Sequence, residues 1–172
     1  MKVVFLDRDG VINKDVGYLH KISDFRFIDG VFYACQHFQS LGYKLVIVTN
    51  QSGIGRGYYQ EEDFYKLTHW MLSEFHNQGI DLLDVFHCPH SPELFCKCRK
   101  PQPGMLIAAR DKYNINMSES WMIGDKESDI EAAMAAGITN TILVKSGHII
   151  NERNTKAKFI LDSIEETKDI IR

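Results

Sequence analysis

Short apolar runs alternate along the chain with stretches in which apolar residues recur every three or four positions. The runs at 3–6 and 44–48 are rich in β-branched and other apolar residues. Such runs are typical of strands that are buried on both faces and therefore belong to a parallel sheet. Further strands are predicted at 85–87, 121–123, 141–144 and 159–161, the last of them at an edge of the sheet.

Helical spacing is found between these runs. Apolar residues share one side of a helix from 31 to 41, before Gly42, and again from 61 to 77, before Gly79; glycine is the usual residue just beyond a helix end. Further helices are predicted at 105–113, 128–136 and 163–171. The alternation of strands and helices indicates an α/β fold with a parallel sheet and helices on both faces. In such folds, ligand sites gather at the carboxyl ends of the strands.

Length and charge narrow the possible functions. The 172 residues fit a single domain spanning 1–172. The net charge is −3 and no block of Lys or Arg stands out, so no nucleic-acid partner is expected. No apolar run approaches the roughly 18 residues of a spanning helix, and the first run is too short for a signal peptide. We therefore expect a cytoplasmic protein with no membrane partner.

Acidic residues follow two of the predicted strands. Asp7 and Asp9 lie in the segment DRDG, and Asp125 lies in the later segment GDKESD. An isolated Asp-x-Asp pair is as often a turn or a helix cap as a site. Carboxylates that converge at one sheet edge without histidine partners, however, suit Mg²⁺, which prefers oxygen ligands.

Two further segments could bind phosphate. The segment TNQSGIGRG at 49–57 supplies a hydroxyl, two amides and glycines whose backbone N–H groups allow close approach. The segment CRKPQPG at 98–104 places Arg99 and Lys100 before two prolines that stiffen the chain. Taken alone, the first fits a glycine-rich turn equally well, and the second fits a solvated surface pair.

Three of the four cysteines lie close together. Cys88, Cys96 and Cys98 share a short segment with His90, whereas Cys35 lies apart in a predicted helix. One imidazole and three thiolates suit a closed, tetrahedral structural Zn²⁺ site, and a chance cluster of buried thiols is the alternative. Bound zinc would stiffen this loop and fix the cations that follow it.

These segments together carry a resemblance to a known family. A strand ending in DRDG, a strand ending in TN, a Lys before Pro and a final GDKESD resemble, in this order, the haloacid dehalogenase (HAD) phosphatases. The segments 17–31, 49–57, 88–90 and 98–106 further resemble the D-glycero-D-manno-heptose 1,7-bisphosphate 7-phosphatases. The resemblance implies a HAD-like Rossmannoid sheet with a zinc loop and no large cap domain. It also implies Mg²⁺-dependent removal of the 7-phosphate, in the synthesis of nucleotide-activated heptose for lipopolysaccharide or capsule.

The resemblance also implies a role for individual residues. Asp7 would be the nucleophile that forms an aspartyl phosphate, and Asp9 would protonate the leaving oxygen and then activate water. Thr49 and Lys100 would stabilise the phosphoryl group in transfer. Asp7, the backbone carbonyl of Asp9 and Asp125 would hold Mg²⁺. The implied substrate contacts are Asp15, Val16, Gly17, Tyr18, Asn50, Gln51, Ser52, Arg99 and Lys126.

Other assignments remain open. The short loop between His90 and Cys96 is similar to that of histidinol phosphatases, so histidinol phosphate is the alternative substrate. A non-catalytic phosphosugar-binding module is the alternative of another class, although the intact acidic motifs count against it. A polynucleotide 3′-phosphatase would need a basic groove.

Smaller expectations concern the remaining residues and the assembly state. Asp129 is expected to orient Lys126 or a metal-bound water. We expect a monomer that acts on a small phosphosugar. No catalytic role is expected for a further group of histidines, namely His20, His37, His69, His76 and His148.

Overall fold

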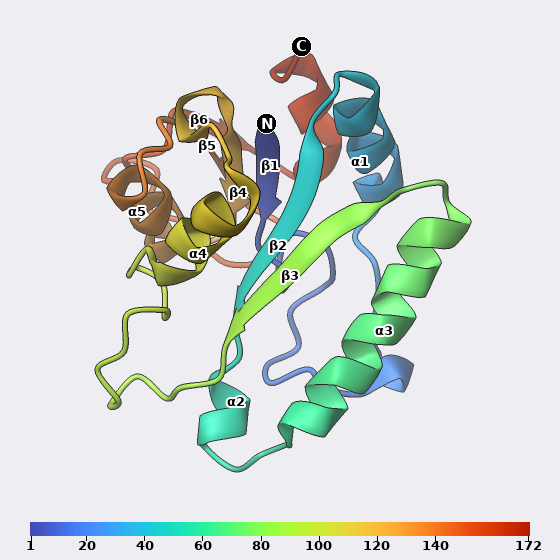
Figure 1. Ribbon diagram of the computed structural model, residues 1–172, viewed down its shortest axis with the longest axis vertical. Coiled ribbons are helices and arrows are strands. Elements are labelled where there is room, and N and C mark those ends of the chain that lie inside the picture. Colours follow the sequence, from blue (N-terminus) through green and yellow to red (C-terminus); the bar gives the residue numbers. More distant parts are fainter.

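The computed structural model describes residues 1–172 and contains one parallel sheet of six strands (Figure 1). The spatial order of the strands is β3-β2-β1-β4-β5-β6. Their bounds are Val3–Leu6 for β1, Lys44–Asn50 for β2, Leu82–Cys88 for β3, Trp121–Gly124 for β4, Asn140–Val144 for β5 and Phe159–Leu161 for β6. The predicted strands are all confirmed, and β6 lies at the sheet edge as expected.

Five α-helices and three short 3₁₀ helices connect the strands. The α-helices are α1 (Val31–Ser40), α2 (Ser52–Gly55), α3 (Glu61–Asn77), α4 (Gly104–Tyr113) and α5 (Glu127–Ala135). The 3₁₀ helices are η1 (Ile22–Asp24), η2 (Met117–Glu119) and η3 (Ile164–Asp169). Two details differ from the sequence-based expectation: the predicted helix at 163–171 is the 3₁₀ helix η3, and the short helix α2 was not predicted.

The two faces of the sheet carry separate hydrophobic cores. Alternate residues of β1 point to opposite faces, so that Val4 and Leu6 contribute to one core and Val3 and Phe5 to the other. The first core packs against α1, α3 and η3, and the second packs against α4 and α5, as the layers in Figure 1 show. Burial on both faces confirms the doubly covered parallel sheet.

The chain reverses through loops at the carboxyl edge of the sheet. Residues 7–30 follow β1 and 89–103 follow β3, and the only regular element within these two loops is η1. The structure therefore has no large cap domain over the strand ends, as expected. The backbone N–H of Asp7 donates to the carbonyl of Ile123 at 3.0 Å, which brings the end of β1 beside the end of β4.

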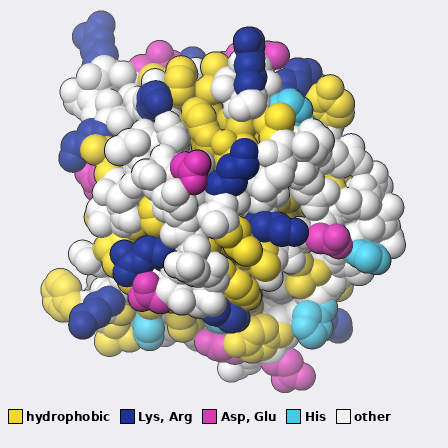
Figure 2. Space-filling view, turned by 45° about the horizontal axis from the view of Figure 1, so that its top comes forward, with side chains coloured by type: hydrophobic (Ala, Val, Ile, Leu, Met, Phe, Trp, Pro, Cys, Tyr) yellow, Lys and Arg dark blue, Asp and Glu magenta, His cyan; other side chains and the backbone are white.

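The surface carries mixed charges. Figure 2 shows Lys and Arg side chains spread singly over the face in view, with Asp and Glu side chains among them. None of the helices has both the length and the apolar composition needed to span a membrane.

Candidate active site

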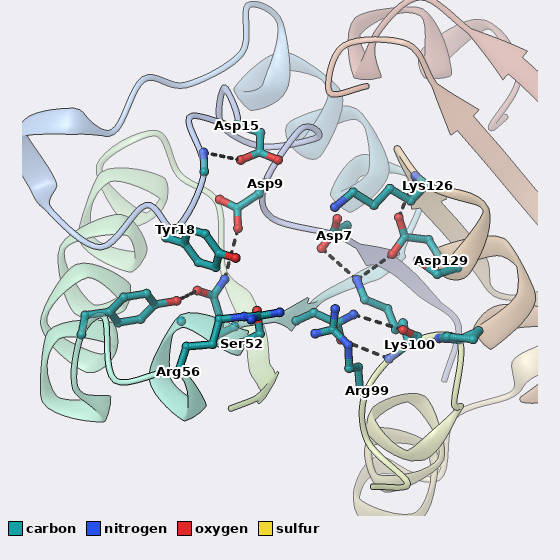
Figure 3. Close-up of a pocket in the computed structure, with 17 residues that line it drawn as sticks. Asp7, Asp9, Asp15, Tyr18, Ser52, Arg56, Arg99, Lys100, Lys126 and Asp129 are labelled. Carbon is teal, nitrogen blue, oxygen red and sulfur yellow. Dashed lines mark hydrogen bonds and ion pairs between the residues drawn. The ribbon is translucent and has the colours of Figure 1, made fainter. Parts of the chain in front are cut away.

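An open pocket of about 480 Å³ lies at the carboxyl ends of the strands (Figure 3). Most of the residues proposed from the sequence line it: Asp7, Asp9, Asp15, Gly17, Tyr18, Asn50, Gln51, Ser52, Arg99, Lys100 and Lys126. Its wall is strongly polar, with carboxylates on the floor and the cations Arg56, Arg99 and Lys126 among the lining side chains. Such a pocket suits an anionic ligand, because the cations of the wall can balance its negative charge.

A buried ion-pair network forms the floor. The Lys100 ammonium lies 2.8 Å from Asp7 Oδ1 and 2.6 Å from Asp129 Oδ1, and it donates to the Val48 carbonyl at 2.8 Å. Burial and the nearby Asp129 carboxylate raise the pKa of Asp7 well above its usual range, although Lys100 opposes this. Burial works against the charge of Lys100, but Asp129 and Asp7 raise its pKa and keep it cationic.

Besides binding Lys100, the Asp129 carboxylate accepts hydrogen bonds at the start of α5. Its Oδ2 accepts from the backbone N–H groups of Asp125 and Lys126, each at 3.1 Å. A carboxylate in this position satisfies free N–H groups at a helix start. The sequence suggested that Asp129 orients Lys126 or a metal-bound water, whereas in the structure its carboxylate binds the Lys100 ammonium and these two backbone groups.

Asp125 is fully buried beside this network and lacks a full set of partners. Its Oδ2 lies 2.5 Å from His148 Nδ1, while its Oδ1 has no hydrogen-bond partner. A Cβ on Gly10 or Gly147 would overlap the Asp125 carboxylate, so both glycines are needed for the backbone to approach it. Burial, and then the Asp129 carboxylate, raise the pKa of Asp125 to about 7.

These acidic groups fit a divalent cation. Oxygen atoms of Asp7, Asp125 and Asp129 all lie within 4.8 Å of one another. The Lys100 ammonium pairs with Asp7 and Asp129 only, and one buried oxygen of the third carboxylate, Asp125, is unpaired. An all-oxygen donor set with unbalanced negative charge is the chemistry that Mg²⁺ prefers.

Asp9 lies across the pocket in a different environment. Its Oδ1 accepts from Asn13 Nδ2 at 2.9 Å and from the Arg8 guanidinium at 3.0 Å. Its Oδ2 accepts from Gln51 Nε2 and from the same guanidinium, each at 3.2 Å. Arg8 is itself fully buried, so the Asp9 carboxylate is held from behind by a fixed cation.

Asn50 joins the end of β2 to the loop that carries Lys100. Its Nδ2 donates to the Lys100 carbonyl at 3.2 Å, and its Oδ1 accepts the Lys100 backbone N–H at 3.0 Å. This reciprocal pair fixes the backbone of the buried lysine directly. Asn50 therefore positions Lys100, in addition to lining the pocket.

The cysteine cluster predicted from the sequence is assembled in the loop after β3. Ligand atoms of Cys88, His90, Cys96 and Cys98 lie within 4.8 Å of one another. His90 uses Nδ1, which is 3.2 Å from Cys98 Sγ and 3.5 Å from Cys88 Sγ. The Arg99 backbone N–H donates to Cys96 Sγ at 3.3 Å. Three sulfurs and one imidazole nitrogen around a common centre fit a closed tetrahedral metal site.

A few proposed residues lie outside the pocket wall. Val16 is exposed and does not line the cavity. Thr49 is fully buried behind Gln51, and its hydroxyl accepts from Gln51 Nε2 at 2.8 Å. Asp125 lies below the floor, beside Asp7 and Asp129.

Other residues of the site were not predicted from the sequence. Arg56, Tyr59 and Ser128 line the pocket, and His148 lies between Asp125 and Asp15, 3.2 Å from Asp15 Oδ2. His148, for which no catalytic role is expected from the sequence, thus contacts two carboxylates of the site. Arg56 falls inside the segment 49–57 that was singled out for its glycines. No local signal marks His148, because it reaches the site through a loop after β5.

Comparison with known proteins places the chain in a family. Residues 97–167 match the family model described as "HAD-hyrolase-like". The chain is 50% identical to the D-glycero-β-D-manno-heptose-1,7-bisphosphate 7-phosphatase of Vibrio cholerae, over 95% of this chain and 92% of the relative. It is 48% identical to the D-glycero-α-D-manno-heptose-1,7-bisphosphate 7-phosphatase of Photorhabdus laumondii, over 91% of this chain and 90% of the relative.

Solved structures give the same assignment. The D,D-heptose 1,7-bisphosphate phosphatase of B. bronchiseptica, complexed with magnesium and phosphate, superposes with a TM-score of 0.88 at 28% identity. That alignment covers 99% of this chain and 98% of the other. A HAD-like phosphatase from Mesorhizobium loti superposes with a TM-score of 0.85, also at 28% identity, over 99% of this chain and 84% of the other. The chain thus belongs to the heptose 1,7-bisphosphate 7-phosphatase family of HAD-like hydrolases.

Proposed function

We propose that this protein is a Mg²⁺-dependent phosphatase that removes the 7-phosphate of D-glycero-D-manno-heptose 1,7-bisphosphate. The observation that carries the proposal is the pairing of Asp7 with Lys100 on the pocket floor, beside the unpaired buried oxygen of Asp125. A nucleophilic carboxylate, a fixed ammonium and an incomplete oxygen site are the parts that phosphoryl transfer to a side chain requires. The curated relatives at 44–50% identity support the substrate.

Asp7 would be the nucleophile. Its carboxylate forms a bond to phosphorus as the bond from phosphorus to the sugar oxygen breaks, which gives an aspartyl phosphate. Lys100, held by Asn50 and Asp129, neutralises charge on the phosphoryl oxygens during this transfer. Thr49 would act here through Gln51, since its hydroxyl binds that side chain.

Asp9 would move the proton. It gives a proton to the leaving sugar oxygen in the first step and takes one from the attacking water in the second. Its side chain is bound by Arg8, Asn13 and Gln51. These three partners would hold the side chain in place for proton transfer, and the backbone carbonyl of Asp9 would be left for the metal.

We further propose Mg²⁺ as the resident ion, held by Asp7, Asp125 and the backbone carbonyl of Asp9. When bound, Mg²⁺ lowers the charge repulsion between the nucleophile and the phosphate. The cations on the pocket wall would receive the rest of the substrate. Arg56, Arg99 and Lys126 all line the pocket and would offer positive charge to the second phosphate of a bisphosphate.

The cysteine cluster would hold structural Zn²⁺ through Cys88, His90, Cys96 and Cys98. Burial raises the pKa of the Cys88 thiol, so a cation is required to hold it as a thiolate. Zinc would fix the loop from which Arg99 and Lys100 directly follow. Thiolate ligands need a reducing environment, which agrees with the expectation of a cytoplasmic enzyme.

Phosphate release tests the function. The protein is supplied with Mg²⁺ and either heptose 1,7-bisphosphate or histidinol phosphate, and Asp7→Asn serves as the blank. We expect faster release from the heptose and none from the variant. Faster release from histidinol phosphate would show that the short zinc loop, and not the matched segments, reports the substrate. Release from neither would favour a binding module.

A further inference from the structure

Tyr59 lies in the pocket wall between α2 and α3, and its hydroxyl is directed at Gln51. The ring is buried, with 5% of its surface exposed, and its hydroxyl lies 2.5 Å from Gln51 Oε1. Because an amide oxygen only accepts hydrogen bonds, the tyrosine hydroxyl is the donor in this pair. Burial raises the pKa of Tyr59 to about 12, so the hydroxyl keeps its proton at neutral pH.

This bond decides which way the Gln51 amide faces. With Oε1 bound to Tyr59, the other end of the amide points toward the catalytic residues. Its Nε2 donates to Asp9 Oδ2 at 3.2 Å and to Thr49 Oγ1 at 2.8 Å. A flipped amide would place its oxygen against the Asp9 carboxylate and would leave both acceptors without this donor.

The two oxygens of Asp9 are not equivalent in this arrangement. Oδ1 accepts from Asn13 and from both Nε and one terminal nitrogen of Arg8, while Oδ2 accepts from Gln51 and from the same terminal nitrogen of Arg8. Oδ2 accepts two hydrogen bonds, each at 3.2 Å, whereas Oδ1 accepts three, the shortest at 2.9 Å, so Oδ2 is the oxygen that takes a proton more readily. Gln51 is the one side chain besides Arg8 that fixes where this oxygen points.

We propose that Tyr59 is a positioning residue for the proton transfer, because its hydroxyl locks the Gln51 amide that orients Asp9 Oδ2 toward the leaving group. This inference rests on the proposed function. In the first step, the Asp9 Oδ2 proton passes to the sugar oxygen as that oxygen leaves phosphorus and Asp7 bonds to it. In the second step, Asp9 recovers a proton from the water that displaces Asp7 from phosphorus. Protons and bonds therefore balance over the cycle.

The surroundings of Tyr59 are built to hold the ring still. The imidazole of His20 stacks on it, with ring centres 4.8 Å apart and planes 8° from parallel. On the side of α2, a Cβ on Gly53 would overlap the ring edge, so the ring packs directly against the glycine backbone. A ring clamped by neighbouring groups carries its hydroxyl to one place, which an exposed tyrosine such as Tyr58 does not do.

The leaving group provides the test. Tyr59→Phe is assayed with the heptose bisphosphate, whose alkoxide must be protonated as it leaves, and with 4-nitrophenyl phosphate, whose phenolate leaves readily without a proton. We expect kcat/KM for the sugar phosphate, which reports the first step alone, to fall about 5- to 10-fold, the effect of a hydrogen bond of about 1 kcal/mol. For the aryl phosphate, kcat/KM should stay within about twofold, because its first step needs no proton from Asp9. An equal fall with both substrates, or no fall with either, would overturn the inference.

Two controls separate this role from general damage. Tyr113→Phe removes another tyrosine hydroxyl, one that donates to Asp84 outside the pocket, and it should leave both rates unchanged. Gln51→Leu removes the amide itself and should show the same dependence on the leaving group. Adding Tyr59→Phe to Gln51→Leu should cost nothing more, because the tyrosine acts through the amide. Additive losses would contradict the proposed linkage.

The same assay distinguishes failure of this inference from failure of the proposed function. If wild-type protein cleaves the heptose bisphosphate, Asp7→Asn does not and Tyr59→Phe matches wild type with both substrates, only the inference falls. If wild-type protein cleaves neither substrate, the proposed function falls and the inference falls with it.

Discussion

The stability of the metal-free protein should depend on pH through Asp125. Its carboxyl is fully buried, and burial with the Asp129 charge raises its pKa from 3.8 to about 7. Between these two pKa values the folded protein binds more protons than the unfolded chain does. The free energy of unfolding therefore falls as pH rises through this range, and the cost is complete above about pH 7.

The magnitude follows from the difference between the two pKa values. About three pKa units correspond to about 4 kcal/mol, of which about 3 kcal/mol falls between pH 5 and pH 8. Burial raises the pKa of Asp7 too, so its contribution has the same sign. In a domain of this length, each kcal/mol changes Tm by roughly 2–4 °C. The loss should therefore be plain in a thermal melt.

The assay is urea or thermal unfolding of wild type and Asp125→Asn, each with EDTA and with Mg²⁺, at pH 5 and pH 8. Without metal at pH 8, the uncharged amide should make the variant more stable than wild type by up to about 4 kcal/mol. Mg²⁺ should stabilise wild type and flatten its pH dependence, and it should do neither for the variant. A metal-free variant that is less stable than wild type at pH 8 would refute the reasoning.

Other single substitutions test separate parts of the site and the fold. Lys100→Met should lower kcat at least about 100-fold. It should also destabilise the metal-free protein by about 3–5 kcal/mol, because the carboxylates of Asp7 and Asp129 lose their buried cation. A variant as stable as wild type would contradict this. Cys98→Ser should lower kcat and should also lower the zinc content, measured by elemental analysis. Cys35→Ala changes a cysteine outside the cluster and should change neither quantity. Full zinc occupancy in Cys98→Ser would count against the zinc site. Ser120→Ala should cost about 1–3 kcal/mol in urea unfolding without changing kcat, because the buried Val3 N–H loses its acceptor, and an unchanged urea midpoint would argue otherwise.

The sheet could be predicted from the sequence because its signal is local. Strands buried on two faces must be apolar throughout, and β1 and β2 show this in their own residues. Strands whose residues are only partly buried were harder to predict from the sequence. β3 extends back to Leu82 through residues that are only half-buried, including Asp84, so its first part shows no clear strand pattern.

Short elements escaped prediction for another reason. The helix α2 spans a single turn and contains two glycines, so neither propensity nor periodicity could mark it. The helical spacing at 163–171 was real, but the segment folds as the 3₁₀ helix η3, which packs against α1 through Ile164. Periodicity shows which residues face the core more surely than it shows the type of helix.

The active-site motifs were predictable because each lies in a continuous segment at a strand end. The parts of the site that could not be predicted are contacts between different segments of the chain. Tyr59 meets Gln51 only after α2 turns the chain, and His148 meets Asp125 only because Gly10 and Gly147 let two loops approach. Nothing in the sequence around His148 indicates that contact.

The two ligand clusters of the structure are coupled through one short segment. Cys98, Arg99 and Lys100 are consecutive. A metal at the cysteine cluster would therefore fix the backbone one residue before Arg99, which lines the pocket wall, and two residues before the buried Lys100. Asn50 fixes the same segment from the other side. A metal bound at the cysteine cluster would therefore stiffen the active-site segment of a domain that has no large cap.

The most direct test of the central claim is to follow heptose 1,7-bisphosphate by ³¹P NMR after adding the protein and Mg²⁺. Both anomers should be tried, because the relatives are named for one or the other. We expect the resonance of the 7-phosphate to disappear and inorganic phosphate to appear, while the phosphate on the anomeric carbon remains. Loss of the anomeric phosphate, or a spectrum that folded protein with Mg²⁺ leaves unchanged, would contradict the proposed function.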